Sequence, residues 1–313
     1  MARRLWIMAI LLVLCCIAFM VLGARGSWSF ILPFRGTKLA ALILVGATVS
    51  TATVLFQTIS QNRILTPSIM GFDALYVLLL TASVFFLGAM TVVQIPPYVS
   101  FIVTAGALTL AALALFGTLL HRARGDLLRM ILTGIIFAAL FQSLTSLLQR
   151  MIDPNEFTVI QVASYARFTQ IEKDLLGISA LIAGAALGRA WWIRHRLDVL
   201  TLGQDSATTL GEPPRPLELE ALILIAVLVA VSTALVGPVA FLGLLVVSLA
   251  RLITPTERHA ILLPSAGLIS AITLVGGQTV MERALGLSTP LSVVIDLLGG
   301  AIFLILLLKG TRR

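Results

Sequence analysis

The fold is decided by one stretch, Gly237-Pro-Val-Ala-Phe-Leu-Gly-Leu-Leu-Val-Val-Ser-Leu-Ala-Arg251. Its apolar run is shorter than the roughly 20 helical residues that cross a membrane, and it opens with a Gly-Pro pair that interrupts a helix. The polar segment 194–216 lies upstream, whereas apolar runs of membrane length fill most of the remaining sequence. One large polar loop ahead of a half-length helix is typical of a transporter whose energy is supplied by another protein. The loop is then the segment on which that protein acts.

The composition is that of an integral membrane protein. Hydrophobic residues make up 59% and charged residues 12% of the chain, and the mean hydropathy is +1.06, whereas a soluble domain carries about 25% charged residues. The apolar runs lack the alternation of barrel strands, so helices must satisfy the backbone in lipid. We predict an all-α integral membrane fold with about ten transmembrane helices in one bundle, and treat residues 1–313 as a single permease domain. The predicted spans are 5–24, 39–57, 72–91, 99–120, 127–149, 175–193, 217–236, 238–252, 261–281 and 291–308.

The basic residues set the orientation. An even number of spans puts both ends on one side, and twice as many arginines and lysines fall on the side of the termini as on the opposite side. The positive-inside rule therefore predicts that both termini and segment 194–216 are cytoplasmic. Segment 150–174 is too polar to span, so we expect a short helix at the outer surface. The basic residues flank spans and form no single patch, so the expected partner is the lipid bilayer and not nucleic acid.

The motifs of catalysis and metal binding are absent from the sequence. None of the lysines follows a glycine, so the chain has no phosphate-binding loop. All three histidines, His259 included, fall in predicted cytoplasmic segments, and we interpret them as loop residues at the lipid headgroups. A transmembrane metal site would need converging ligands that the sequence lacks. We predict no enzyme activity, no cofactor and no metal site.

Several predicted spans contain polar residues. Those of the fifth span gather on one side of a helix, and two interpretations stay open: hydrogen bonding within the bundle, or a polar stripe along a translocation path. Asp73 and Asp296 are functional candidates, because carboxylates near the membrane interior are costly; Asp73 has the alternative of pairing with a helix dipole. The residues assigned to a path are Gln57, Asn62, Gln142, Ser143, Thr145 and Ser146.

Four segments carry a family resemblance. In chain order they are Arg35-Gly-Thr-Lys38 with the run Leu39 to Ala47, then Gln57 to Gly71, then Leu197 to Gly211, then Gly237 to Arg251. Together they resemble the FecCD-type permease subunits of ABC importers for iron-siderophores, haem and cobalamin. The resemblance extends over nearly the whole chain. Departures are Arg63 in place of the usual proline, and Val247-Ser248 in place of Pro-His.

The stretch Asn62-Arg-Ile-Leu-Thr-Pro-Ser-Ile-Met-Gly-Phe-Asp73 is similar to a branch associated with ferric catecholate-type siderophores. The resemblance implies a permease that imports an iron-siderophore across the bacterial inner membrane, and favours a heterodimer with a second permease over a homodimer. Separate cytoplasmic ATPases and an extracytoplasmic binding protein are the further partners implied. Haem or cobalamin import is the alternative. An ion-coupled secondary transporter, with Asp296 as its relay, is a more distant one.

The resemblance also implies two docking regions. Binding-protein docking is assigned to Arg35 and Lys38, expected as unpaired cations on the outer rim, and to Arg283 as a looser match. Segment 194–216 resembles the loop that contacts the ATPase, and we expect it to form short helices. The residues assigned to coupling are Leu200, Leu202, Gly203, Ala207, Leu210 and Gly211.

Overall fold

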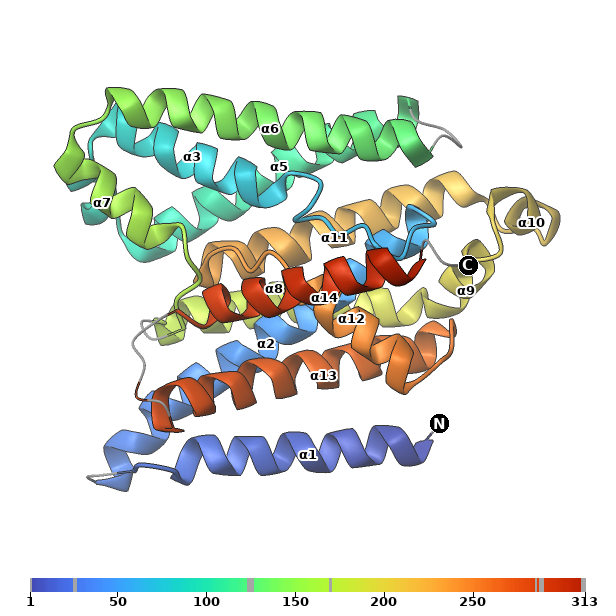
Figure 1. Ribbon diagram of the computed structural model, residues 1–313, viewed down its shortest axis with the longest axis horizontal. Helices are drawn as coiled ribbons and strands as arrows, with labels where there is room; N and C mark the ends of the chain where they lie inside the picture. The colour runs from blue at the N-terminus through green and yellow to red at the C-terminus, as the bar shows by residue number, and fades with distance from the viewer. Residues whose placement is uncertain are drawn as a thin grey trace.

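The computed structural model describes residues 2–24, 27–122, 127–168, 171–284, 286 and 290–310, and regular secondary structure in these ranges is entirely helical. Most helices run side by side along the long axis of the molecule (Figure 1). Within the described part, seven helices are long and apolar enough to cross a membrane. Three further apolar helices lie over Phe72–Leu87, Leu242–Ile253 and Leu291–Gly310, and the first two are shorter. Together they confirm the predicted all-helical membrane fold and the approximate helix count.

The elements follow one another with few long connections. The helix predicted at the outer surface is α7, where Pro154 occupies the first turn and the carboxylate of Asp153 accepts the N–H of Asn155 as an N-cap. The predicted short helices of 194–216 are α9 and α10. The full set is α1 (Ala2–Val21), α2 (Trp28–Ile59), α3 (Phe72–Leu87), α4 (Ala89–Gln94), α5 (Pro97–Arg122), α6 (Leu127–Met151), α7 (Pro154–Ala163), α8 (Lys173–Trp192), α9 (Arg194–Leu200), α10 (Gln204–Thr209), α11 (Pro214–Val236), α12 (Leu242–Ile253), α13 (His259–Thr279), η1 (Val280–Ala284) and α14 (Leu291–Gly310).

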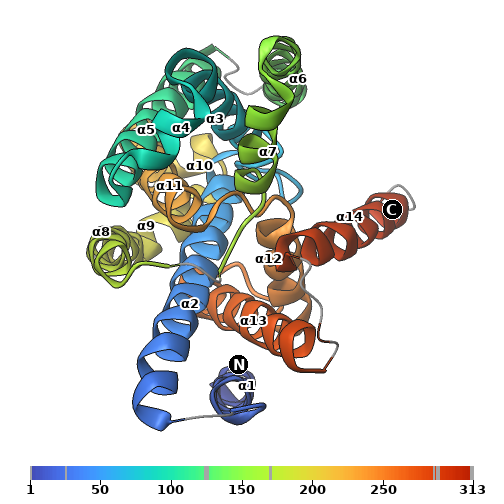
Figure 2. The same ribbon diagram turned by 90° about the vertical axis from the view of Figure 1, so that its left-hand side faces the viewer.

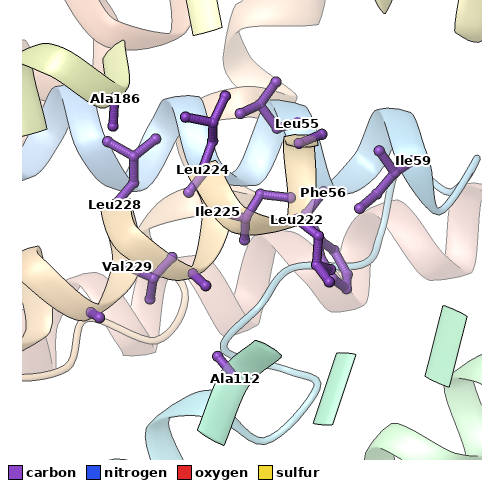
Figure 3. Close-up of a cluster of buried hydrophobic side chains, with 14 of the residues drawn as sticks. Leu55, Phe56, Ile59, Ala112, Ala186, Leu222, Leu224, Ile225, Leu228 and Val229 are labelled. Carbon is purple, nitrogen blue, oxygen red and sulfur yellow. The ribbon is translucent and has the colours of Figure 1, made fainter. Parts of the chain in front are cut away.

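Helix α2 is the centre of the bundle. It is longer than its predicted span and packs against α11, α12 and α13 (Figure 2). Leu55 and Phe56 of α2 lie close to Leu222 and Ile225 of α11, with Ala112 of α5 in the same cluster (Figure 3). Lipid is as apolar as these side chains, so close van der Waals packing stabilises this contact more than the hydrophobic effect does.

Several serine and threonine hydroxyls of α2 form hydrogen bonds within the helix itself. The hydroxyls of Ser50, Thr53 and Thr58 donate to the carbonyls of Gly46, Val49 and Val54, one turn earlier. This back-bonding removes the cost of burying an unpaired hydroxyl. These bonds favour hydrogen bonding within the bundle over a polar path for these three residues.

The two ends of the molecule differ. The start of α1, the end of α14 and both α9 and α10 lie at one end, whereas α7 and the connection from α1 to α2 lie at the other (Figure 1). The start of α1 and the end of α14 therefore lie on the same side as the segment 194–216, as an even number of spans predicts. That this side is cytoplasmic remains the prediction of the basic-residue asymmetry.

Candidate functional site

A groove of about 460 Å³ lies between α3, α6 and α14. Its floor is the connection from α11 to α12 and the residues that follow α7. The lining is polar for a site between apolar helices. Its polar members are Asp73 of α3, Gln142, Thr145, Ser146 and Gln149 of α6, Ser164 and Tyr165 after α7, and Ser292 and Asp296 of α14.

The connection from α11 to α12 exists because Gly237 and Pro238 end a helix. Gly237 has a φ of +99°, and a β-carbon there would lie 3.1 Å from the Cα of Ala166, so both its conformation and its surroundings favour glycine. The N–H of Arg167 donates to the carbonyl of Val236 at 2.7 Å. This hydrogen bond joins the chain after α7 to the end of α11, and thereby forms the floor of the groove.

The two carboxylates reach the groove from opposite helices. Asp73 is the second residue of α3, and its Oδ2 is buried without a hydrogen-bond partner in the described chain. Asp296 lies on α14, where its Oδ1 accepts the N–H of Phe241 at 3.1 Å. This bond fixes α14 against the connection that precedes α12.

The groove includes some of the residues assigned to a path and excludes others. Gln142, Thr145 and Ser146 line it, and the hydroxyl of Thr145 also donates to Phe141 one turn earlier. Ser143 does not line it. Gln57 and Asn62 also lie elsewhere: Gln57 donates to the carbonyl of Arg63 and accepts from Arg251, and Asn62 accepts the N–H of Ile64. Of the six, only Gln142, Thr145 and Ser146 are brought together with Asp73 and Asp296.

The apolar residues in and beside α9 and α10 are of two kinds, exposed and buried. Leu202 and Leu210 are 61% and 64% exposed. Leu200 and Ala207 are buried against the body of the protein, so the expectation that they contact another subunit is wrong; they instead attach the two short helices to the bundle. Gly203 and Gly211 have φ values of +97° and +83°. Gly203 is the N-cap of α10 and Gly211 follows its C-cap residue, so both allow the turns that flank this short helix.

An ion pair and a further side-chain hydrogen bond order the segment that contains α9 and α10 and attach it to α11. Arg196 of α9 donates through Nε and Nη2 to Oε1 of Glu212, at 2.9 and 2.7 Å. Hydrogen bonding to Glu212 raises the pKa of Arg196. Nε2 of Gln204 on α10 donates to Oε1 of Glu218 on α11 at 2.7 Å. These bonds between side chains give α9 and α10 a defined position relative to α11.

His259 is a functional candidate that the sequence analysis dismissed. It is the first residue of α13, is 1% exposed, and its ring lies between Asp198 of α9 and Thr58 of α2. Both its backbone N–H and its Nδ1–H donate to Oδ1 of Asp198 at 2.7 Å, and its Nε2 lies 2.8 Å from the hydroxyl of Thr58. One imidazole therefore connects three helices. No local pattern marked it, because its partners are 61 and 201 residues away.

The charge on Asp198 is stabilised by this arrangement. Burial raises the pKa of Asp198, but the hydrogen bonds from His259 outweigh burial and hold that pKa below its usual value. A carboxyl with a lowered folded-state pKa stabilises the fold at pH values above the ordinary carboxyl range. This contribution is lost only as the pH falls through the lowered value, so the contact is complete at neutral pH.

The outer end of the bundle brings together the three residues assigned to binding-protein docking. Arg35 and Lys38 belong to α2, 6% and 7% exposed, and Arg283 lies in η1. The expectation that the first two are unpaired is wrong. Lys38 forms a salt bridge with Glu282, which lies 244 residues away. The guanidinium of Arg35 donates to four carbonyls at the end of α1, those of Phe19, Met20, Leu22 and Gly23.

Comparisons with known proteins agree with one another. The sequence model of the FecCD transport family matches residues 7–309. The petrobactin import system permease YclO of Bacillus subtilis (strain 168) is 41% identical over 301 residues, which are 96% of this chain and 96% of that protein. The petrobactin import system permease FatC of Bacillus anthracis is 32% identical over 98% of this chain and 90% of its own length. A solved structure described as an inward-facing metal-chelate type ABC transporter is similar with a TM-score of 0.80 and 26% identity, covering 98% of this chain and 99% of that one.

Proposed function

This chain belongs to the FecCD transport family, and from that premise we propose that it is the membrane permease of a bacterial ABC importer for a ferric siderophore. The observation that carries the proposal is the match over nearly the whole chain to permeases named for petrobactin import. ATP would be hydrolysed by separate subunits, since no phosphate-binding loop occurs in the sequence. The chain would act as one permease domain, paired with a second and different permease.

The groove is proposed as this chain's part of the translocation path. It is large and polar, and helices of the bundle enclose it on several sides. Irregular backbone at membrane depth is tolerated where it lines a cavity, and the connection over Gly237 to Phe241 is such a segment. A partner permease facing the groove would complete the path, and alternation between two states would open it to either side.

Helices α9 and α10 are proposed as the surface that receives the ATPase. Leu202 and Leu210 are exposed apolar residues on a segment otherwise fixed by ion pairs, so they suit a docking contact. The contact between His259 and Asp198 would pass a displacement of α9 to α13 and α2. A rigid connection of this kind is what converts a movement at one surface into a rearrangement of the bundle.

Reconstitution tests this function. The chain is combined in proteoliposomes with a second permease, ATPase subunits and a binding protein encoded beside it. We expect ATP-dependent uptake of radiolabelled ferric petrobactin, and no uptake when the ATPase carries a substitution in its phosphate-binding lysine. Uptake of haem or cobalamin, with no uptake of any ferric siderophore, would overturn the proposed substrate class.

A further inference from the structure

The two carboxyl groups of the groove have no cationic partner in the described chain. Asp73 and Asp296 both line it, and its described lining contains no arginine, lysine or histidine. Neither carboxylate takes part in a salt bridge with a described residue. Elsewhere in the described bundle the carboxylates of Glu212, Glu220 and Glu282 do have cationic partners. The two carboxyl groups of the groove lack the cationic partner that these three glutamates have.

A third oxygen points to a ligand in the same place. Ser292 lines the groove one turn before Asp296 on α14, is 1% exposed, and its hydroxyl has no hydrogen-bond partner in the described chain. Oδ2 of Asp73 is buried and also without a partner. Buried polar atoms without partners are costly, so both oxygens are available to accept hydrogen bonds from a ligand in the groove.

The chemistry of that group follows from the donors it must supply. Ionised carboxylates only accept hydrogen bonds, and an ammonium group only donates them. Carboxylates near the membrane interior ordinarily pair or mark the path of a cation. We infer that Asp73, Asp296 and Ser292 form a subsite for a protonated amine on the chelate as it passes through the groove. This inference rests on the proposed function, and it narrows the substrate class to ferric chelates that carry protonated amines.

The subsite would then bind the amine of the chelate without coordinating its iron. A ferric chelate is bulky, and its size would be accommodated by the groove and the partner permease together. Its cationic side arm would lie between α3 and α14, where the two carboxylates face a common space. A site of this kind would orient the ligand without holding the iron, because no ligand exchange at the metal is needed. Neutral chelates of the same size would lose this contact.

The test places one cysteine in the groove of the assembled complex. Cys15 and Cys16 are replaced by alanine, the partner subunits are made free of cysteine, and Ser146→Cys supplies an exposed thiol on the groove wall. Spermidine is the probe for protonated amines. Fully N-acetylated spermidine and sodium chloride at equal ionic strength are the controls. We expect spermidine to slow labelling by a maleimide, and neither control to do so.

The matched variants test whether protection by spermidine depends on the two carboxylates. Combining Asp73→Asn with Asp296→Asn is expected to raise the spermidine concentration for half-protection by about tenfold. Asp174→Asn, which changes an exposed acidic residue at the start of α8, should leave it unchanged. If the double variant does not assemble, each single variant and Ser292→Ala serve instead, with smaller rises expected.

The outcomes separate this subsite from the proposed function. Absence of protection, equal protection by sodium or acetylated spermidine, or full protection in the asparagine variants would each overturn the subsite. Uptake of ferric siderophore by the wild-type complex is measured in parallel. Normal uptake without spermidine protection rejects the subsite alone, whereas absence of uptake for every ferric siderophore tested rejects the proposed function.

Discussion

The imidazole of His259 and the carboxylate of Asp198 form a double contact, in which Oδ1 of Asp198 accepts both the ring Nδ1–H and the backbone N–H of His259 at 2.7 Å. The contact joins α9 to the start of α13. The side-chain amide of Gln61 donates to the carbonyl of Leu200 at 2.9 Å and gives α9 a second attachment, next to α2. The proposed coupling role of α9 requires such firm attachment, since a flexible loop would absorb the displacement.

Replacing Asp198 with alanine should uncouple ATP hydrolysis from transport. The change leaves two buried N–H groups of His259 without their acceptor, at a cost of about 1–3 kcal/mol each, so α9 loses its attachment to α13. We expect uptake in proteoliposomes to fall by at least about tenfold, while ATP hydrolysis by the complex continues. Asp198→Asn keeps an acceptor oxygen and should retain part of the uptake. Asp174→Ala, at an exposed position at the start of α8, is the control, and equal uptake by both alanine variants would refute the idea.

Gly203 should not tolerate a larger residue. Its φ of +97° is strained for any residue with a β-carbon, at about 1–2 kcal/mol or more, although no atom lies within 4 Å of the position a β-carbon would take. Gly203→Val should therefore shift α10 through the backbone and reduce uptake, with normal amounts of permease in the membrane. Gly188→Val is the matched control, because that glycine also has open space but lies within helix α8. Uptake at the wild-type rate in Gly203→Val would show that the turn is not needed for coupling.

Leu202 and Leu210 should provide much of the apolar contact with the ATPase. Burying a leucine side chain contributes about 1.5–3 kcal/mol, so replacing either with glutamate should weaken ATPase binding by roughly tenfold to a hundredfold. Binding of purified ATPase to the permease dimer in detergent measures this directly. Thr209→Glu adds the same charge at a neighbouring exposed position and should have a smaller effect. If all three variants bind the ATPase equally, the contact surface lies elsewhere.

The sequence predicts local features of this protein better than the contacts that cross it. Composition and the length of the apolar runs were enough to predict the helical fold. Helical periodicity was enough to predict that Gln142, Thr145 and Ser146 lie on one face of α6. The groove itself was not predictable, because Asp73 and Asp296 come from helices far apart in the chain. The pairing of Lys38 with Glu282 was missed for the same reason. The segment 25–38 contains no acidic residue of its own, so nothing in the local sequence indicated a partner on η1.

The orientation in the membrane can be tested with two cysteines. In a background with Cys15 and Cys16 replaced by alanine, Ser27→Cys and Ser206→Cys are made one at a time. Ser27 lies between α1 and α2, and Ser206 lies in α10 at the opposite end of the bundle (Figure 1). A membrane-impermeant maleimide added to intact cells should label only the first, and added to inverted vesicles only the second. Labelling of both from the same side would reject the predicted topology.

Arg35 and Arg283 should respond differently to charge reversal, although both were assigned to docking. Arg35 binds four carbonyls at the end of α1, where a cation also complements the helix dipole. Arg35→Glu should therefore destabilise the α1–α2 contact by on the order of 3 kcal/mol, and reduce the amount of folded permease in the membrane. Arg283 is more exposed, and its nearest acidic partner, Glu282, lies 3.7 Å away and also binds Lys38.

Arg283→Glu is therefore the variant that tests docking of the binding protein. A rim charge acts mainly on the encounter rate, so we expect normal amounts of permease and slower uptake at low ionic strength. The difference from wild type should shrink at high salt, where exposed charges are screened. Reversal of an acidic residue on the binding protein to lysine should restore part of the uptake. If Arg283→Glu imports at the wild-type rate in low salt while Arg35→Glu is merely unstable, these cations stabilise the outer end of the bundle and do not dock the binding protein.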